Sequence, residues 1–253
     1  MGKCKDIVIK VIPANVAIPF VKAHHYSGKV VNNSQLHFGC FLGGKLHGVM
    51  SFGPSMDKRK VIGLVEGTGF NEFIELNRMA FDDYLPRNAE SYCIGYALRR
   101  IKKQAPHIKW VVSFADGTQC GDGTIYRASN FVLTGINPNK TIVLMPDGSA
   151  VAGLTLDLQR PTTKARYDKM CGLDPTKRYT RADYIRGGGK FMQGYMLRYI
   201  YFLDMKYKDK LTVPILPFSK IDEMGAGMYK GQSIKREERH VECEAQKERA
   251  KDG

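Results

Sequence analysis

The chain has 253 residues, 43% of them hydrophobic, which is enough to bury one sizeable core and indicates one domain with additions rather than two full domains. Its formal net charge of +14 favours a polyanionic partner, with nucleic acid the first candidate, although a solubilising or membrane-surface role would give the same charge. With no apolar run long enough to span a bilayer, no apolar signal core, and six cysteines lacking a C-x-x-C pair, we expect a soluble cytoplasmic protein without a zinc cage or disulfide framework.

The first predicted elements are a strand and a helix. Residues 6–14 alternate and are rich in β-branched side chains, as in a strand, and Asn15 can cap a helix over residues 16–25. That helix ends in His24 and His25. Because adjacent residues on a helix point in different directions, we expect only one of the two histidines to face any given site.

A hairpin is predicted next. Two apolar runs, residues 36–42 and 46–52, flank Gly43-Gly44-Lys45, and a glycine-rich turn between apolar runs is typical of a β-hairpin. A polar stretch through Gly69 follows the second run.

Residues 72–81 predict another strand, in which three polar side chains interrupt the apolar pattern. Glu75, Asn77 and Arg78 lie on a strand that should be largely buried. An unpaired charge there is costly, so each needs a partner or an open cleft. A structural Glu–Arg pair and a catalytic role remain equally good interpretations.

The clearest helix signal begins at Asn88, which is suited to the N-cap position. The helix should end before Pro106, and its last turns are basic, which suits the negative end of the helix dipole. Its apolar positions recur with helical spacing: Ile94, Leu98, Ile101 and Ala105.

The stretch from residue 108 to residue 130 holds the strongest candidates for chemistry. Residues 108–115 predict a buried strand that ends in Asp116, and α/β folds place ligands at such strand ends. A glycine-rich loop follows, although a simple Asp-Gly turn would look the same. In the short helix predicted over residues 123–130, Tyr126 could donate a proton and Arg127 could bind phosphate, or both could pack ordinarily.

The remainder of the chain divides into an insertion, further strands and a tail. A turn over residues 135–140 separates two of the strands, and residues 150–193 are polar and punctuated by glycine and proline, as in an insertion. We expect one domain over residues 1–229 and a charged, flexible tail over residues 230–253. The remaining strands are predicted at residues 131–134, 141–145 and 195–203.

This order predicts an α/β (α+β) fold, with a mixed central sheet flanked by helices and an insertion before the last strands. It resembles the GNAT acyltransferase fold, in which two neighbouring central strands, here 72–81 and 108–116, splay apart. GNAT enzymes carry Q/R-x-x-G-x-G/A before the central helix, whereas residues 82–91 hold no glycine and two aspartates, which argues against ordinary coenzyme A binding. The amides at the helix start could still bind an anion such as acetyl-CoA or another acyl-CoA. The candidates for that role are Arg87, Asn88 and Ser91.

Several long strings resemble one family closely. They are HHYSGK (24–29), NEFIELNRMAFDD (71–83), LPRNAES (85–91), VVSFADGTQCGDGTIYRASNFVLTG (111–135), and YMLRYIYFLD with LTVPILPF (195–218). These strings resemble the phage Mom family over most of the chain, and only the charged tail is left out.

The resemblance implies a GNAT-like protein that converts adenine in duplex DNA to N6-(carbamoylmethyl)adenine and protects phage DNA from host restriction. It implies an iron requirement, double-stranded DNA and a small-molecule group donor as partners, no membrane, and the host cytoplasm as location. The catalytic positions that it implies are His25, Tyr26, Arg78, Asp116 and Tyr126. Of these, His25, Tyr26 and Asp116 would be the metal ligands, a nitrogen and oxygen set that suits iron.

The product limits the mechanism. Attack of an amine on an acyl thioester gives an amide, whereas a carbamoylmethyl group joins the amine through a methylene carbon. We therefore expect an alkylating or rearrangement step organised by the metal and Asp116, with Tyr126 or His25 handling protons, Arg78 orienting the donor or a phosphate, and the adenine flipped out of the duplex. The alternatives are an acyl-CoA-dependent N-acyltransferase of the GNAT type and a non-catalytic basic DNA-binding protein.

Overall fold

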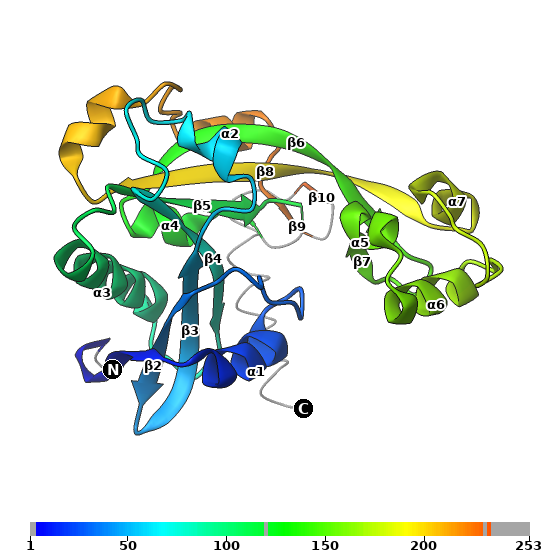
Figure 1. The fold of residues 1–253 in the computed structure, drawn as a ribbon, viewed down its shortest axis with the longest axis horizontal. Helices are drawn as coiled ribbons and strands as arrows, with labels where there is room; N and C mark the ends of the chain where they lie inside the picture. Colours follow the sequence, from blue (N-terminus) through cyan, green and yellow to red (C-terminus); the bar gives the residue numbers. More distant parts are fainter. Residues whose placement is uncertain (1–3, 119–120, 230–231, 234–253) are drawn as a thin grey trace.

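The computed structural model describes residues 4–118, 121–229 and 232–233. A mixed sheet in the order β1-β2-β3-β4-β5-β8-β6-β7 runs through the molecule, with helices on both faces (Figure 1). This confirms the predicted fold class. Its strands are β1 (Val8–Ile12), β2 (Leu36–Leu42), β3 (Lys45–Gly53), β4 (Phe73–Phe81), β5 (Trp110–Asp116), β6 (Val132–Leu144), β7 (Ala150–Ala152) and β8 (Lys190–Phe202), and β9 (Met228–Tyr229) pairs separately with β10 (Gln232–Ser233).

The helices connect these strands. They are α1 (Ala14–His24), α2 (Lys58–Ile62), α3 (Ala89–Gln104), α4 (Thr124–Ala128), α5 (Gly153–Leu158), α6 (Pro161–Met170), α7 (Arg181–Arg186) and α8 (Ser219–Glu223), with 3-10 turns η1 (Cys4–Asp6) and η2 (Met205–Lys210). None of the helices that the structure describes is both long and apolar enough to cross a membrane. The cysteines in the described ranges, Cys4, Cys40, Cys93 and Cys171, are free thiols.

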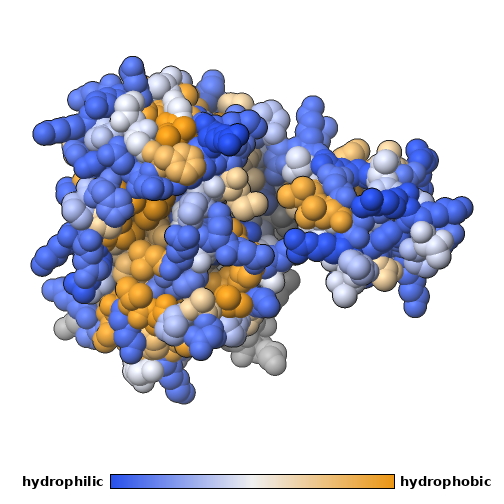
Figure 2. Space-filling model, viewed as in Figure 1, coloured by the Kyte–Doolittle hydropathy of each residue, from blue (hydrophilic) through white to orange (hydrophobic). Residues whose placement is uncertain are grey.

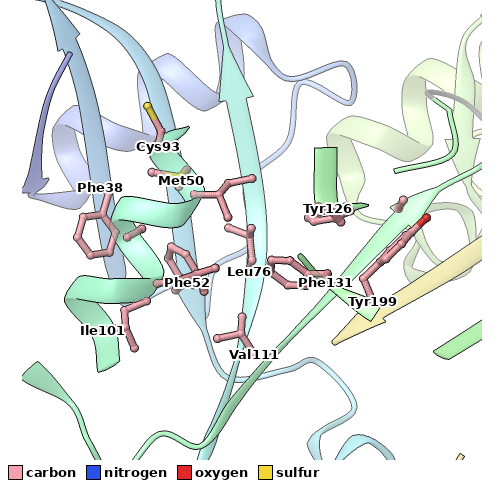
Figure 3. Packing of buried hydrophobic residues seen from close by; sticks show 14 of the residues in the cluster. Phe38, Met50, Phe52, Leu76, Cys93, Ile101, Val111, Tyr126, Phe131 and Tyr199 are labelled. Carbon is pink, nitrogen blue, oxygen red and sulfur yellow. The ribbon is translucent and has the colours of Figure 1, made fainter. Parts of the chain in front are cut away.

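The main core lies between α3 and one face of the sheet. Of the apolar positions that predicted α3, Ile94, Leu98 and Ile101 are buried there, while Ala105 is the C-cap and is only partly buried. Figure 3 shows Cys93 and Ile101 of α3 among side chains from β2, β3, β4 and β5, and shows the aromatic group that closes the core near α4. We call this side of the sheet the α3 face.

The opposite side of the sheet, the α1 face, has its own apolar contacts. Ala17 and Val21 of α1 pack on β3 and β4. Nearer the middle of the sheet, Phe73 of β4 stacks on Trp110 of β5 with ring centroids 4.5 Å apart, and the Trp110 indole N–H donates to Thr68 Oγ1 at 3.1 Å. These contacts show which side chains of β4 and β5 point to the α1 face.

The central strands β4 and β5 are parallel and separate, as predicted. Their pairing covers Phe73–Glu75 and Trp110–Val112, whereas β4 continues to Phe81 and β5 to Asp116. Just past the last pair, Ser113 Oγ donates to the carbonyl of Leu76 at 3.1 Å. Beyond that point no ladder pairing joins the two strands in the part of the chain described.

A β-bulge in β4 changes which side chains share a face. Ser51 of β3 pairs with Arg78, but the next residue, Phe52, pairs with Leu76, so Asn77 is the extra residue. Residues an odd number apart on a regular strand point to opposite faces. Because of the bulge, Glu75 and Arg78 both point to the α1 face, together with Phe73.

Two local predictions were wrong. The helix α1 begins at Ala14 with Pro13 as its N-cap, so Asn15 lies inside the first turn and does not cap it. The predicted turn over residues 135–140 is instead part of β6, which pairs with β8 through two register shifts. Proline has no backbone N–H to donate, and Pro138 is tolerated there because it pairs with β8 only. On the other edge of β6, the strand β7 pairs at Ile142–Leu144.

The predicted insertion contains three helices. The helices α5, α6 and α7 and the strand β7 form a lobe at the far end of the β6 and β8 ribbon (Figure 1). We call residues 145–192 the lobe. It has a small core of its own in which Tyr184 and Leu156 are buried. The strand β8 starts at Lys190, earlier than the predicted residue 195. Of the tail predicted over residues 230–253, only 232–233 lie within the described residues.

Candidate functional site

The end of α1 carries the first site candidates. His25 is the C-cap of α1 and is half-buried, and the Ser27 backbone N–H donates to its Nδ1 at 3.1 Å. The Tyr26 ring lies beside it, with centroids 4.3 Å apart, and is 53% exposed. His24 points elsewhere and stacks on Phe20. The expectation that the two histidines face different ways is therefore confirmed.

Arg78 of β4 lies next to His25. Its Nε donates to the Lys29 carbonyl at 3.2 Å and its Nη1 donates to the Asn77 carbonyl at 2.9 Å. Burial and, second, the charge of Arg78 lower the pKa of His25 from 6.5 to about 4. His25 is therefore neutral at pH 7. Because Nδ1 accepts the Ser27 N–H, the neutral ring carries its proton on Nε2.

Glu75 completes the charged group on this face. Burial raises the pKa of Glu75 above its ordinary value, while hydrogen bonds from Ser55, Asn77 and the Met56 backbone, and the charge of Arg78, act in the opposite direction. The sequence offered Glu75 as a structural partner of Arg78 or a catalytic group. The structure couples the two electrostatically, but within the described residues no ion pair joins them.

Asp116 lies at the end of β5, on the same α1 face. It alternates with Trp110, Val112 and Phe114 along a strand that pairs with β8 without a register shift. Its Oδ1 accepts the Thr118 N–H at 3.1 Å, and the residue is 9% exposed. The end of α1, Arg78 and Asp116 are thus carried on one side of the two separating strands.

Tyr126 lies on the other side. Its ring packs in the core of the α3 face, with centroids 5.1 Å from Tyr199 and 5.4 Å from Phe131, and the residue is 8% exposed (Figure 3). Of the five predicted catalytic residues, the structure therefore places four on or beside the α1 face and one on the α3 face.

A pocket of about 310 Å³ opens beside Tyr126. The hydroxyl of Tyr199 donates to the Asp122 carbonyl at its edge, and burial raises the pKa of Tyr199 far above its ordinary value. Its lining residues come from α4, β8 and α8: Asp122, Thr124, Arg127, Tyr199, Phe218, Ser219, Ile221 and Asp222. Apart from the segment around α4, these residues were not predicted as site residues, because they are distant along the chain and share no catalytic motif.

The start of α3 holds the candidates for anion binding. Asn88 is the N-cap as predicted, but its φ is 66° and its side chain makes no capping bond. Ser91 Oγ donates to the Asn88 carbonyl at 3.1 Å, and Arg87 is exposed. Asp82, which we expected to repel phosphate, lies 2.8 Å from His47 Nδ1 and is held against β3. A binding role for Arg87, Asn88 and Ser91 remains a prediction.

Comparison with known proteins identifies the family. Residues 6–220 match the Mom protein family. The chain belongs to this family. The match includes every residue predicted above to be catalytic, metal-binding or anion-binding. Methylcarbamoylase mom from Escherichia phage Mu is 40% identical to this Mom family member over 132 residues, which are 52% of this chain and 54% of that protein. The alignment thus spans about half the length of that relative.

Solved acetyltransferase structures also resemble this Mom family member. The ribosomal-protein-S18-alanine N-acetyltransferase from Escherichia coli is 10% identical, with a TM-score of 0.42 over 79% of this chain and 95% of that one. The IAA acetyltransferase from Bacillus cereus is 11% identical, with a TM-score of 0.43 over 78% and 99%. Because these TM-scores are low, the fold assignment rests on the sheet topology described above and not on these structures.

Replacing Arg78 by Gln should raise the pKa of His25 above about 4 while leaving it below 6.5, because burial is the larger cause of the shift. Titration of the histidine ring by NMR measures this.

In the wild type the unfolded chain binds a proton at His25 that the folded chain does not, so the free energy of unfolding should fall as pH drops from 6.5 towards 4. Arg78→Gln should reduce that loss. Arg87→Gln is the matched control, and an unchanged pKa in Arg78→Gln would contradict the coupling.

Proposed function

We propose that this chain is a DNA-modifying transferase that converts adenine in duplex DNA to N6-(carbamoylmethyl)adenine and so protects phage DNA from host restriction. The observation that carries the proposal is the family match, which contains all the candidate residues, together with a relative named as a methylcarbamoylase. The net charge of +14 supports DNA as the substrate. The host cytoplasm, where phage DNA is exposed to restriction, is the proposed location.

The reaction that we propose is an alkylation. The adenine N6 attacks the methylene carbon of a small-molecule carbamoylmethyl donor, and the bond between that carbon and the leaving group breaks. The electron pair of the broken bond goes to the leaving group, and the N6 proton is transferred to a basic group. Reaching N6 requires the adenine to leave the base stack.

The side chains of the α1 face suit different parts of this step. With a pKa of about 4, His25 is a weak base but a neutral one, which favours metal ligation or hydrogen bonding over proton abstraction. Arg78 supplies a positive charge beside it for a phosphate or for the donor. Asp116 supplies a carboxylate at the end of β5. Tyr126 would handle protons only from the α3 face, where its ring is buried.

Iron fits the chemistry of the donor set that we propose for it. A neutral imidazole, a phenol and a carboxylate, from His25, Tyr26 and Asp116, are a mixed nitrogen and oxygen set. Within the described ranges no three His, Cys, Asp or Glu side chains are grouped to hold a metal, so a site here would need a ligand of another kind, such as the Tyr26 phenol. His25 would supply its neutral imidazole, whose Nδ1 is held by Ser27 through the backbone N–H at 3.1 Å and the Oγ at 2.8 Å. When bound, iron would act as a Lewis acid.

The test combines product and metal analysis. Plasmid DNA from cells that express the wild-type chain under iron-replete conditions should yield carbamoylmethyladenine nucleoside by mass spectrometry. The purified protein should contain iron by elemental analysis, and His25→Ala and Tyr26→Phe should lower that content several-fold. Wholly unmodified adenine would overturn the proposed reaction. Acyl-coenzyme A turnover without DNA would favour an ordinary acyltransferase instead, and unchanged metal content in both variants would remove these residues as ligands.

A further inference from the structure

The lobe, residues 145–192, touches the rest of the molecule beside the candidate site. It is carried on the ribbon of β6 and β8 and projects away from the main sheet (Figure 1). Its helix α5 returns to the body: Lys29 Nζ donates to Thr155 Oγ1 at 3.3 Å. Lys29 follows His25 in the same loop, and its carbonyl accepts from Arg78. One side of α5 therefore lies next to the loop that carries His25.

The acidic side chains of the lobe all have partners of opposite charge, whereas some of its basic side chains do not. All of its carboxylates form ion pairs with lysine or arginine, so its acidic groups are already neutralised. Among the described residues, four exposed cations of the lobe have no carboxylate partner. They are Arg160, Lys169, Arg178 and Lys190. Exposed cations without acidic partners are what contacts with a phosphate backbone require.

The helix α5 also exposes two leucines. Leu154 is 56% exposed and Leu158 is 50% exposed, and residues four apart lie on the same side of a helix. Leu156, between them in sequence, is buried in the lobe core and anchors the opposite side. Figure 2 shows an apolar patch over α5 on the side turned towards the body. Neither leucine is part of the buried core of the lobe.

We infer that the lobe is a DNA-binding arm, in which the four unpaired cations hold phosphates and Leu154 and Leu158 pack against bases beside the extruded adenine. This rests on the proposed function. DNA is the occupant that the charges favour, because an exposed apolar pair on the same lobe as unpaired cations complements a duplex that is opened locally. Apolar side chains fill the space between unstacked bases in this way in many proteins that distort DNA. The contact with Lys29 places this pair near the His25 loop.

The first experiment tests the leucines. The variant Leu154→Ala with Leu158→Ala is compared with Val8→Ala and Val11→Ala on the edge strand β1, where the side chains are similarly exposed at 60% and 56%. A duplex with 2-aminopurine at the target adenine reports extrusion by fluorescence. The leucine variant should keep its melting temperature, and its affinity for the duplex should stay within about threefold of the wild type. It should lose the rise in fluorescence, and its yield of modified adenine should fall at least about tenfold. The valine variant should match the wild type.

The second experiment tests the cations. Arg160→Gln combined with Lys169→Gln should reduce the slope of log K against log salt by about 2, since each lost phosphate contact removes about 1. Lys5→Gln combined with Lys45→Gln, on exposed residues away from the lobe, should leave it unchanged.

The outcomes separate this inference from the proposed function. If the wild type makes no modified adenine, the proposed function fails, while the salt slopes still test the arm. If the wild type modifies DNA and the leucine variant does so equally, with equal extrusion, the inference is overturned. It is also overturned if the leucine substitutions convert a dimer to a monomer in sedimentation and leave extrusion intact, because the patch would then bind a second copy.

Discussion

Replacing Asp116 by Asn is expected to lower the yield of modified adenine by about 10²-fold or more while leaving duplex affinity within about twofold. The amide oxygen of Asn can still accept the Thr118 N–H that Asp116 Oδ1 accepts, so the turn after β5 should keep its shape. The substitution removes the negative charge from the α1 face and replaces one carboxylate oxygen by an amide nitrogen. Nucleoside mass spectrometry gives the yield, and fluorescence anisotropy gives the affinity.

Asp122→Asn is the matched control. Asp122 lies in the same loop, and its Oδ1 accepts the Thr124 N–H in the same kind of turn at 3.0 Å. It lines the pocket on the other side rather than ending a strand. Full activity in Asp116→Asn would show that Asp116 serves only the turn, and an equal loss in both variants would show that the loop and not the carboxylate matters.

Gly194→Ala should lower the melting temperature by roughly 3–10 °C, from an overpacking cost of about 1–3 kcal/mol, and should also reduce activity. A methyl group on Gly194 of β8 would overlap the side chain of Thr118, which is fully buried and unable to move aside. Displacing Thr118 would break the hydrogen bond that its backbone makes to Asp116. Scanning calorimetry and the nucleoside assay measure the two effects.

Two comparisons make this prediction specific. Gly63→Ala should be nearly neutral, because Gly63 has a φ of −69° and the nearest atom, the Lys60 carbonyl oxygen, would be 3.7 Å from the new Cβ. Adding Thr118→Gly to Gly194→Ala should restore part of the lost stability, because the overlapping side chain is removed. A Gly194→Ala protein that is as stable as the wild type would contradict this account.

The parts of the fold that follow from periodic burial could be predicted from the sequence. The helix α3 could be predicted because Ile94, Leu98 and Ile101 recur at helical spacing and all face the core. The hairpin of β2 and β3 could be predicted because two glycines, Gly43 and Gly44, lie between apolar runs, and both adopt the positive φ that such a turn needs. The separation of β4 and β5 was expected because the predicted strand order resembles the GNAT fold, in which two central strands splay apart.

The arrangement of the site could not be predicted in the same way. A single bulge at Asn77 decides that Glu75 and Arg78 share a face, and a bulge depends on the pairing with β3, which residue types do not record. The sequence also gave no means to see that Tyr126 packs on the side opposite Asp116. Pro138 indicated a turn, but it lies in β6 at a position where only one edge of the strand is paired, and a proline is tolerated there.

The separation of β4 and β5 leaves two strand edges facing each other inside the sheet. Past Val112 the described ladder ends, so peptide N–H and carbonyl groups of both strands are turned towards the space between them, with Ser113 Oγ bonded to one carbonyl. A primary amide, such as the carbamoyl group of the proposed donor, has two donors and one acceptor, the same kinds of group that a peptide presents. Such a molecule could be held as an added strand is held, by main-chain bonds alone. Recognition of that kind would leave no mark in side-chain motifs.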